Sequence, residues 1–68
     1  MPVRYHVLSS FIAIKPLDDG YTIIAIPRGC TIEIFGEVQR SGLVDGAFEG
    51  QAVAVFMRDV EARTERVD

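Results

Sequence analysis

The stretch that decides the fold spans residues 31–56 and reads TIEIFGEVQRSGLVDGAFEGQAVAVF. In its first part Ile32 and Ile34 fall on one side of an extended chain, and Glu33 and Phe35 fall on the other. Apolar and polar residues that alternate with period two predict half-buried β-strands. Glycines at the turns divide the stretch, so we expect strands over residues 31–39, 43–48 and 51–56.

Toward the N-terminus, two further apolar segments predict strands near residues 3–14 and 21–26. The first is long, and a bulge at Ser9-Ser10 would switch the face that its side chains occupy. The second is apolar on both faces, which is typical of a strand covered on two sides. A cluster of proline, paired aspartate and glycine over residues 15–20 marks the turn between them.

The pattern changes after Phe56. The apolar side chains of residues 57–67 follow the helical spacing of three and four, and Asp59 can pair with Arg63 one turn later. Two interpretations fit these residues: a short amphipathic helix, or a single 3₁₀ turn at residues 58–60 followed by a last strand. Either one gives at most about two helical turns.

Length and composition favour one all-β domain over residues 1–68. A chain of 68 residues is too short for two cores or for a cofactor-binding α/β fold. Valine and isoleucine far outnumber leucine, which is a β-rich balance. We therefore expect a five- or six-stranded barrel with a short helical turn near the C-terminus. The predicted core is Ile32, Ile34, Val44, Phe48, Val53, Val55 and Val60.

Residues 26–61 resemble the central part of an SH3-like small barrel. The segment 26–34, IPRGCTIEI, is similar to the family's diverging turn and the strand after it. The segment 42–51, GLVDGAFEGQ, is similar to its central hairpin, with the small Gly46 in the core, where we expect larger side chains to be resisted. The segment 55–60, VFMRDV, is similar to its strand, 3₁₀ turn and return. The shape also resembles small uncharacterised bacterial proteins built on this barrel, a resemblance that implies no activity.

The chain departs from the peptide-binding members of that family. Those members use a tryptophan to open the central hairpin, and a proline and a tyrosine around the 3₁₀ turn. Here Leu43 opens the hairpin, the turn reads Met57-Arg58-Asp59, and the sequence has no tryptophan. Capture of proline-rich ligands needs an aromatic groove, so the resemblance does not imply it.

Charge and cysteine content argue against several classes of protein. A formal net charge of −3 disfavours nucleic acid and anionic membranes as partners, because phosphate contacts need a basic face. The apolar stretch 7–14 is too short to span a bilayer. One cysteine excludes a disulfide framework and a cysteine-rich zinc module, and a cytoplasmic location is expected.

No catalytic residue, metal site or cofactor is predicted. His6 is the only histidine, and a general base needs a placed partner that the sequence does not supply. Cys30 follows Gly29 in a turn. Two interpretations are open: a reactive thiol with a lowered pKa, or a structural or incidental cysteine. A cysteine nucleophile would also need His6 beside it.

Two apolar surfaces are candidates for binding. Phe35 points away from the predicted core, and with Leu43 and Phe56 it would form an exposed apolar patch, unless the N-terminal hairpin covers it. The two N-terminal strands carry more apolar residues than one small core can bury. The candidate oligomer interface that follows is Ile12, Ile14, Ile23 and Ile24.

The sequence is most typical of a small cytoplasmic binding or self-assembly module without enzymatic activity. We expect a homo-oligomer, most simply a symmetric dimer, with another protein as an alternative partner. The second hypothesis is an enzyme whose site forms where subunits meet, as in the barrel-like tetrameric dihydrofolate reductases carried on plasmids. The chain has none of that family's site motif, so this analogy is one of architecture. A nucleic-acid-binding barrel is a third hypothesis, which the acidic charge disfavours.

Overall fold

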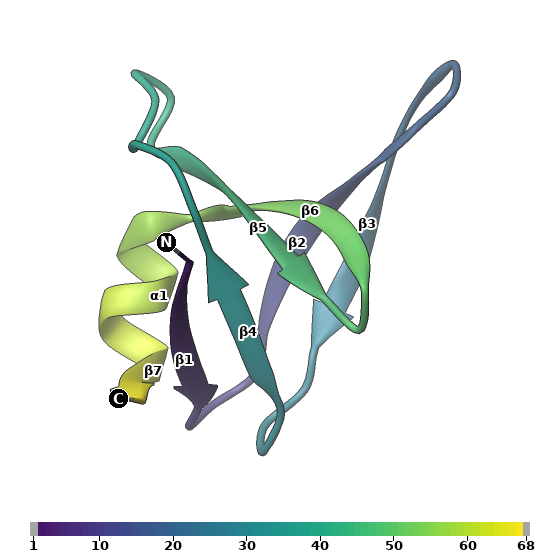
Figure 1. The fold of residues 1–68 in the computed structure, drawn as a ribbon. Helices are drawn as coiled ribbons and strands as arrows, with labels where there is room; N and C mark the ends of the chain where they lie inside the picture. The colour runs from purple at the N-terminus through teal and green to yellow at the C-terminus, as the bar shows by residue number, and fades with distance from the viewer. Residues whose placement is uncertain (1, 68) are drawn as a thin grey trace.

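The computed structural model describes residues 2–67 and contains seven β-strands and one short helix (Figure 1). The all-β fold with a short helix near the C-terminus is confirmed. The elements in chain order are β1 Val3–Val7, β2 Phe11–Leu17, β3 Gly20–Ile26, β4 Thr31–Ile34, β5 Leu43–Phe48, β6 Gln51–Phe56, α1 Met57–Arg63 and β7 Thr64–Val67.

All seven strands belong to one antiparallel sheet in the order β3-β2-β6-β5-β4-β1-β7. The strands β3 and β7 are therefore the two edges of the described sheet. The β2–β3 hairpin projects away from the rest of the molecule, and α1 lies on the side of β1 and β7 (Figure 1). In this sheet β2 meets β6 through the single pair Ile14 and Ala54.

The core lies inside the curved sheet and is entirely apolar among the described residues. All seven predicted core residues are buried. The alternation in β4, β5 and β6 turns six of them to one face, and the helix α1 contributes the seventh, Val60. The strands β1, β2 and β3 complete the core with Val7, Phe11, Ala13 and Ile26.

The predicted strand over residues 3–14 is two strands in the structure. The chain leaves β1 at Leu8, and the N–H groups of Leu8 and Ser9 both donate to the carbonyl oxygen of Arg63. The guanidinium of Arg63 also donates to the hydroxyl of Ser9 at 3.2 Å. The prediction of one bulged strand was wrong because contacts with the distant α1 end the ladder at this point.

The predicted strand over residues 31–39 is shorter than expected and ends at Ile34. Gly36 has φ of 85°, a left-handed conformation that interrupts an extended strand. The predicted turn over residues 15–20 is also shorter, because β2 continues to Leu17 and only Asp18-Asp19 lie between the paired strands. Pro16 is tolerated there because it lies beyond the point where β2 pairs with β6.

The C-terminal segment combines the two interpretations of its sequence. A helix of seven residues is followed directly by β7, which pairs with β1. The predicted pair of Asp59 and Arg63 is present, with 3.6 Å between Oδ1 and Nε. The hydroxyl of Thr64 donates to the carbonyl oxygen of Val60 and closes the last turn of the helix. The division of the N-terminal segment and the formation of β7 give seven strands in place of five or six.

Candidate functional site

Strand alternation gives the sheet an apolar outer surface over β2, β3 and β6. Phe11 and Ala13 of β2 are buried inside, so Ile12 and Ile14 point outward. Ile14 lies between Ile23 of β3 and Ala54 of β6, and cross-strand neighbours share a face. We call this surface the outer apolar face, which consists of Ile12, Ile14, Pro16, Tyr21, Ile23, Ala25, Ala52 and Ala54.

Several large side chains of the outer apolar face are open to solvent. The exposed fraction is 49% for Ile12, 68% for Tyr21 and 51% for Ile23. These three residues come from the two paired strands of the projecting hairpin, so their exposed surfaces adjoin. Isolated exposed apolar residues are ordinary, whereas large contiguous apolar patches are rare on soluble monomers.

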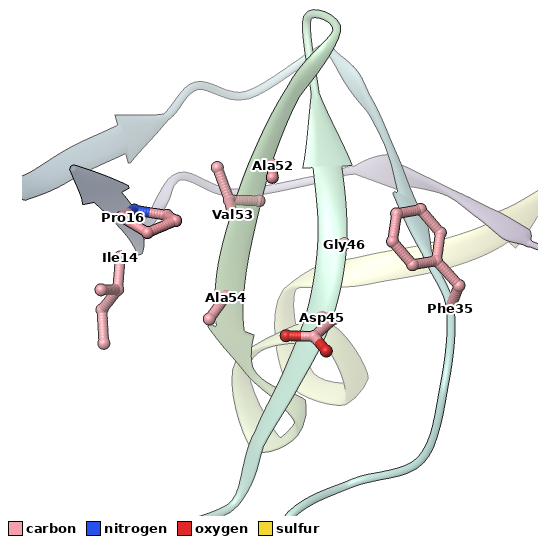
Figure 2. Close-up of a pocket in the computed structure, with 8 residues that line it drawn as sticks. All are labelled: Ile14, Pro16, Phe35, Asp45, Gly46, Ala52, Val53 and Ala54. Carbon is pink, nitrogen blue, oxygen red and sulfur yellow. The ribbon is translucent and has the colours of Figure 1, made fainter. Parts of the chain in front are cut away.

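A pocket of about 450 Å³ lies beside these residues on the same side of the sheet (Figure 2). Ile14 and Pro16 stand on one side of β6, and Phe35 stands beyond β5 on the other (Figure 2). Between them the lining comes from β5 and β6. The lining residues are Ile14, Pro16, Phe35, Asp45, Gly46, Ala52, Val53 and Ala54.

The pocket exists because of what β6 presents outward. This strand turns Val53 and Val55 into the core and Ala52 and Ala54 away from it. The two alanine side chains are too small to fill the space between the neighbouring side chains. The wall opposite Ile14 is fixed by the backbone, since the N–H of Phe35 donates to the carbonyl oxygen of Asp45 at 3.0 Å. Asp45 carries the single ionisable side chain in the described lining.

The outer surface over β4, β1 and β7 carries mostly charged and polar side chains. On β1, Arg4 lies between Glu33 of β4 and Val67 of β7, and His6 lies between Thr31 and Glu65. The outer surface of the sheet is thus divided into a charged part over β4, β1 and β7 and an apolar part over β6, β2 and β3.

His6 and Cys30 do not form a site together. The thiol of Cys30 packs against the core and donates to the carbonyl oxygen of Pro27 at 2.9 Å. Val7, which faces the core, donates its N–H to the carbonyl oxygen of Cys30, whereas His6 is paired with Thr31 on the opposite face. The two side chains therefore lie on opposite sides of the sheet.

The interpretation of Cys30 as a thiol with a lowered pKa was wrong. Burial raises the pKa of the Cys30 thiol above its ordinary value of 9.0, and the negative charge of Glu49 adds to the effect. The backbone N–H of Cys30 opposes this increase in pKa without reversing it. Because the thiolate is the reactive form, this cysteine is less reactive than an unstructured one at neutral pH.

We predict that iodoacetamide alkylates Cys30 more slowly in the folded protein than in the unfolded chain at neutral pH. The folded pKa is the higher one, so folding favours the protonated thiol. This contribution to stability is present below the unfolded pKa and is lost as the pH rises through the folded pKa. The measurement is the alkylation rate against pH with and without denaturant. Equal rates in the two states at neutral pH would contradict the raised pKa.

The residues of the predicted apolar patch are only partly brought together. Phe35 is 41% exposed and lines the pocket. Leu43 and Phe56 are cross-strand partners and half-buried, but neither lines the pocket. The pocket instead uses Pro16, Asp45 and two alanines that the sequence did not mark as site residues.

The residues of the predicted oligomer interface lie on both faces of the hairpin. Ile12, Ile14 and Ile23 are on the outer apolar face. Ile24 pairs with the buried Ala13 and packs against the core. The interface itself stays a prediction.

No group of three or more histidine, cysteine, aspartate or glutamate side chains within residues 2–67 is placed to hold a metal ion. In the same range, no helix has the length and apolar character needed to cross a membrane. Comparison of the chain with models of protein families, with curated proteins and with solved structures finds no match.

Proposed function

We propose that this protein is a small binding module without enzymatic activity, built on an SH3-like barrel, that associates with copies of itself. The observation that carries the proposal is the set of exposed side chains Ile12, Tyr21 and Ile23 on one face of the β2–β3 hairpin. Small monomers rarely leave a large apolar surface in water, and a closed two-fold contact is the commonest way to cover one. A cytoplasmic location fits the free cysteine.

The composition of the pocket favours binding over catalysis. Acid–base chemistry needs a titratable group with a placed partner, and Asp45 is the one ionisable side chain in the described lining. Apolar walls formed by Ile14, Pro16 and Phe35 fit apolar side chains better than a charged substrate.

The test is the mass of the protein by sedimentation equilibrium at micromolar concentrations. We expect the wild type to approach twice the mass of one chain as the concentration rises. The double variant Ile23→Glu/Phe35→Glu is expected to stay at the mass of one chain. It places one carboxylate on the outer apolar face and one at the pocket, and burying either carboxylate in a contact is costly. A wild type that keeps the mass of one chain throughout the range would refute self-association.

The matched control is Val38→Glu. Val38 and Ile23 are each 51% exposed, but Val38 lies in the connection between β4 and β5, outside the outer apolar face. We expect this variant to associate as the wild type does. Equal loss of association in the control would show that added charge, and not the chosen surface, is responsible.

A further inference from the structure

We propose that two copies of the chain pair along their β3 strands, antiparallel, about a two-fold axis that passes beside Ile23. This inference rests on the proposed self-association and specifies its partner, its strand and its register. It uses the unpaired backbone groups of the edge strand β3 together with the side chains that β3 contributes to the outer apolar face.

The strand β3 is an edge without the usual protection. Its only partner in the described sheet is β2. Natural edge strands are protected by charged residues, proline, bulges or short length. The seven residues of β3, GYTIIAI, contain neither a charge nor a proline. The other edge, β7, has four residues and carries both a glutamate and an arginine, so β7 has the protection that β3 lacks.

The pairing with β2 indicates which backbone groups of β3 face outward. Pro16 is opposite Tyr21 and has no N–H to donate, so this pair fits a non-hydrogen-bonded position of the ladder. Antiparallel pairs alternate between the two kinds of position. The N–H and C=O groups of Tyr21, Ile23 and Ala25 are then directed to the free edge, where a second strand can pair with them.

An axis beside Ile23 uses these outward groups together. It places Ile23 opposite Ile23 of the second copy, and Tyr21 opposite Ala25 of the second copy. All of these side chains are on the outer apolar face, where Tyr21 and Ile23 are 68% and 51% exposed. Cross-strand contacts between aromatic and aliphatic side chains stabilise a sheet, and the pairing covers Tyr21 and Ile23, the two most exposed large apolar residues of that face.

Charge at the two ends of β3 favours the antiparallel direction. Asp18-Asp19 precede the strand and Arg28 follows it. With the axis beside Ile23, Gly20 of each copy is opposite Ile26 of the other, so the turn that holds Asp18 lies at the same end of the paired strands as the turn that holds Arg28 of the other copy. A parallel pairing in register would instead place the turn with Asp18 against the same turn of the other copy. The ion pair between Asp59 and Arg63 involves neither Asp18 nor Arg28, and both are exposed in turns where an intermolecular ion pair can form.

Hydrogen exchange as a function of protein concentration tests the inference without any substitution. On dimerisation we expect the amides of Tyr21, Ile23 and Ala25 to exchange more slowly. The amides of Thr22 and Ile24 point to β2 and should be protected at every concentration.

The outcomes separate this inference from the proposed function. A dimer mass with unchanged exchange at Tyr21, Ile23 and Ala25 would overturn β3 pairing and leave self-association standing. A single-chain mass at every concentration would overturn both. In a third outcome, Phe35→Glu abolishes the dimer while Ile23→Glu does not, which would place the contact on the pocket and overturn the edge pairing.

A disulfide trap tests the position of the axis. In a hydrogen-bonded antiparallel pair the Cα atoms are about 5.5 Å apart, within the range that a disulfide bridges. We expect Ile23→Cys in a Cys30→Ala background to form a covalent dimer under mild oxidation at least about tenfold faster than Val38→Cys in the same background. Equal rates would overturn the placement of the axis, because the two positions are equally exposed.

A charge exchange tests the register. Arg28→Asp is expected to weaken dimerisation about tenfold. An exposed ion pair contributes little by itself, but the two-fold axis makes the pair of Asp18 and Arg28 occur twice in the dimer. Asp18→Arg alone should weaken it similarly, and the combination of both should restore most of the loss. Additive weakening in the combined variant would overturn the pairing of these two residues.

Discussion

A chain carrying Val55→Asp is expected to be unfolded in buffer. Val55 is 0% exposed at the middle of the sheet, opposite Val44, which is also buried. A buried carboxylate without a partner costs several kcal/mol. A domain of this size has a total stability of roughly 3–10 kcal/mol, so the substitution removes most or all of it.

Circular dichroism and thermal unfolding measure this effect. The matched control is Val38→Asp, the same chemical change at a residue that is 51% exposed, which should melt cooperatively near the wild-type temperature. A soluble Val55→Asp variant with a cooperative transition would show that the inward face of β6 has been assigned wrongly.

The central strands could be predicted from the sequence because their alternation is local. In β5 and β6, Val44, Val53 and Val55 are separated by small or polar residues, so period two identifies the buried face directly. The N-terminal strands lack this contrast, since Ile23 and Ile24 are adjacent and only the second packs against the core. The face that each residue of β3 occupies depends on its pairing with β2.

The breaks in the predicted strands had non-local or conformational causes. The chain turns at Leu8 because its N–H and that of Ser9 reach the carbonyl oxygen of Arg63, more than fifty residues later in the sequence. The early end of β4 coincides with the left-handed φ of Gly36. A glycine inside an alternating pattern signals such a break, and the pattern alone does not say whether the strand resumes.

Of the residues that line the pocket, the sequence marked Phe35 and Ile14 as candidates for binding, in two separate surfaces. The outward position of Phe35 follows from the alternation of β4, which also places Ile34 inside. The opposite wall comes from β2, which meets β6 through the single pair Ile14 and Ala54. The sequences of β2 and β6 contain no local pattern that predicts their pairing. Alanines give no signal of their own, although here their small size opens the pocket.

Gly46→Ala is expected to destabilise the protein by about 2–3 kcal/mol, the cost of overpacking a tight site. Gly46 lies between Ile34 of β4 and Val53 of β6. A Cβ at this position would be 2.5 Å from the carbonyl oxygen of Glu33 and 3.1 Å from Cδ1 of Ile34. The isoleucine can move slightly, but the carbonyl belongs to the backbone of β4. Moving it disturbs the β4–β5 pairing, which consists of two residue pairs in the described sheet.

Gly36→Ala separates this steric effect from the general cost of replacing a glycine. Gly36 has φ of 85°, and a Cβ added there would meet open space, so its replacement adds backbone strain alone, about 1–2 kcal/mol. Gly46 has no such φ, and its cost comes from the approach of Glu33. Denaturant titration should therefore give a larger loss for Gly46→Ala than for Gly36→Ala. Because the clash is with backbone, Gly46→Val should lower the free energy of unfolding still further. A neutral result for either substitution at Gly46 would mean that β4 can move away from β5 without loss of the sheet.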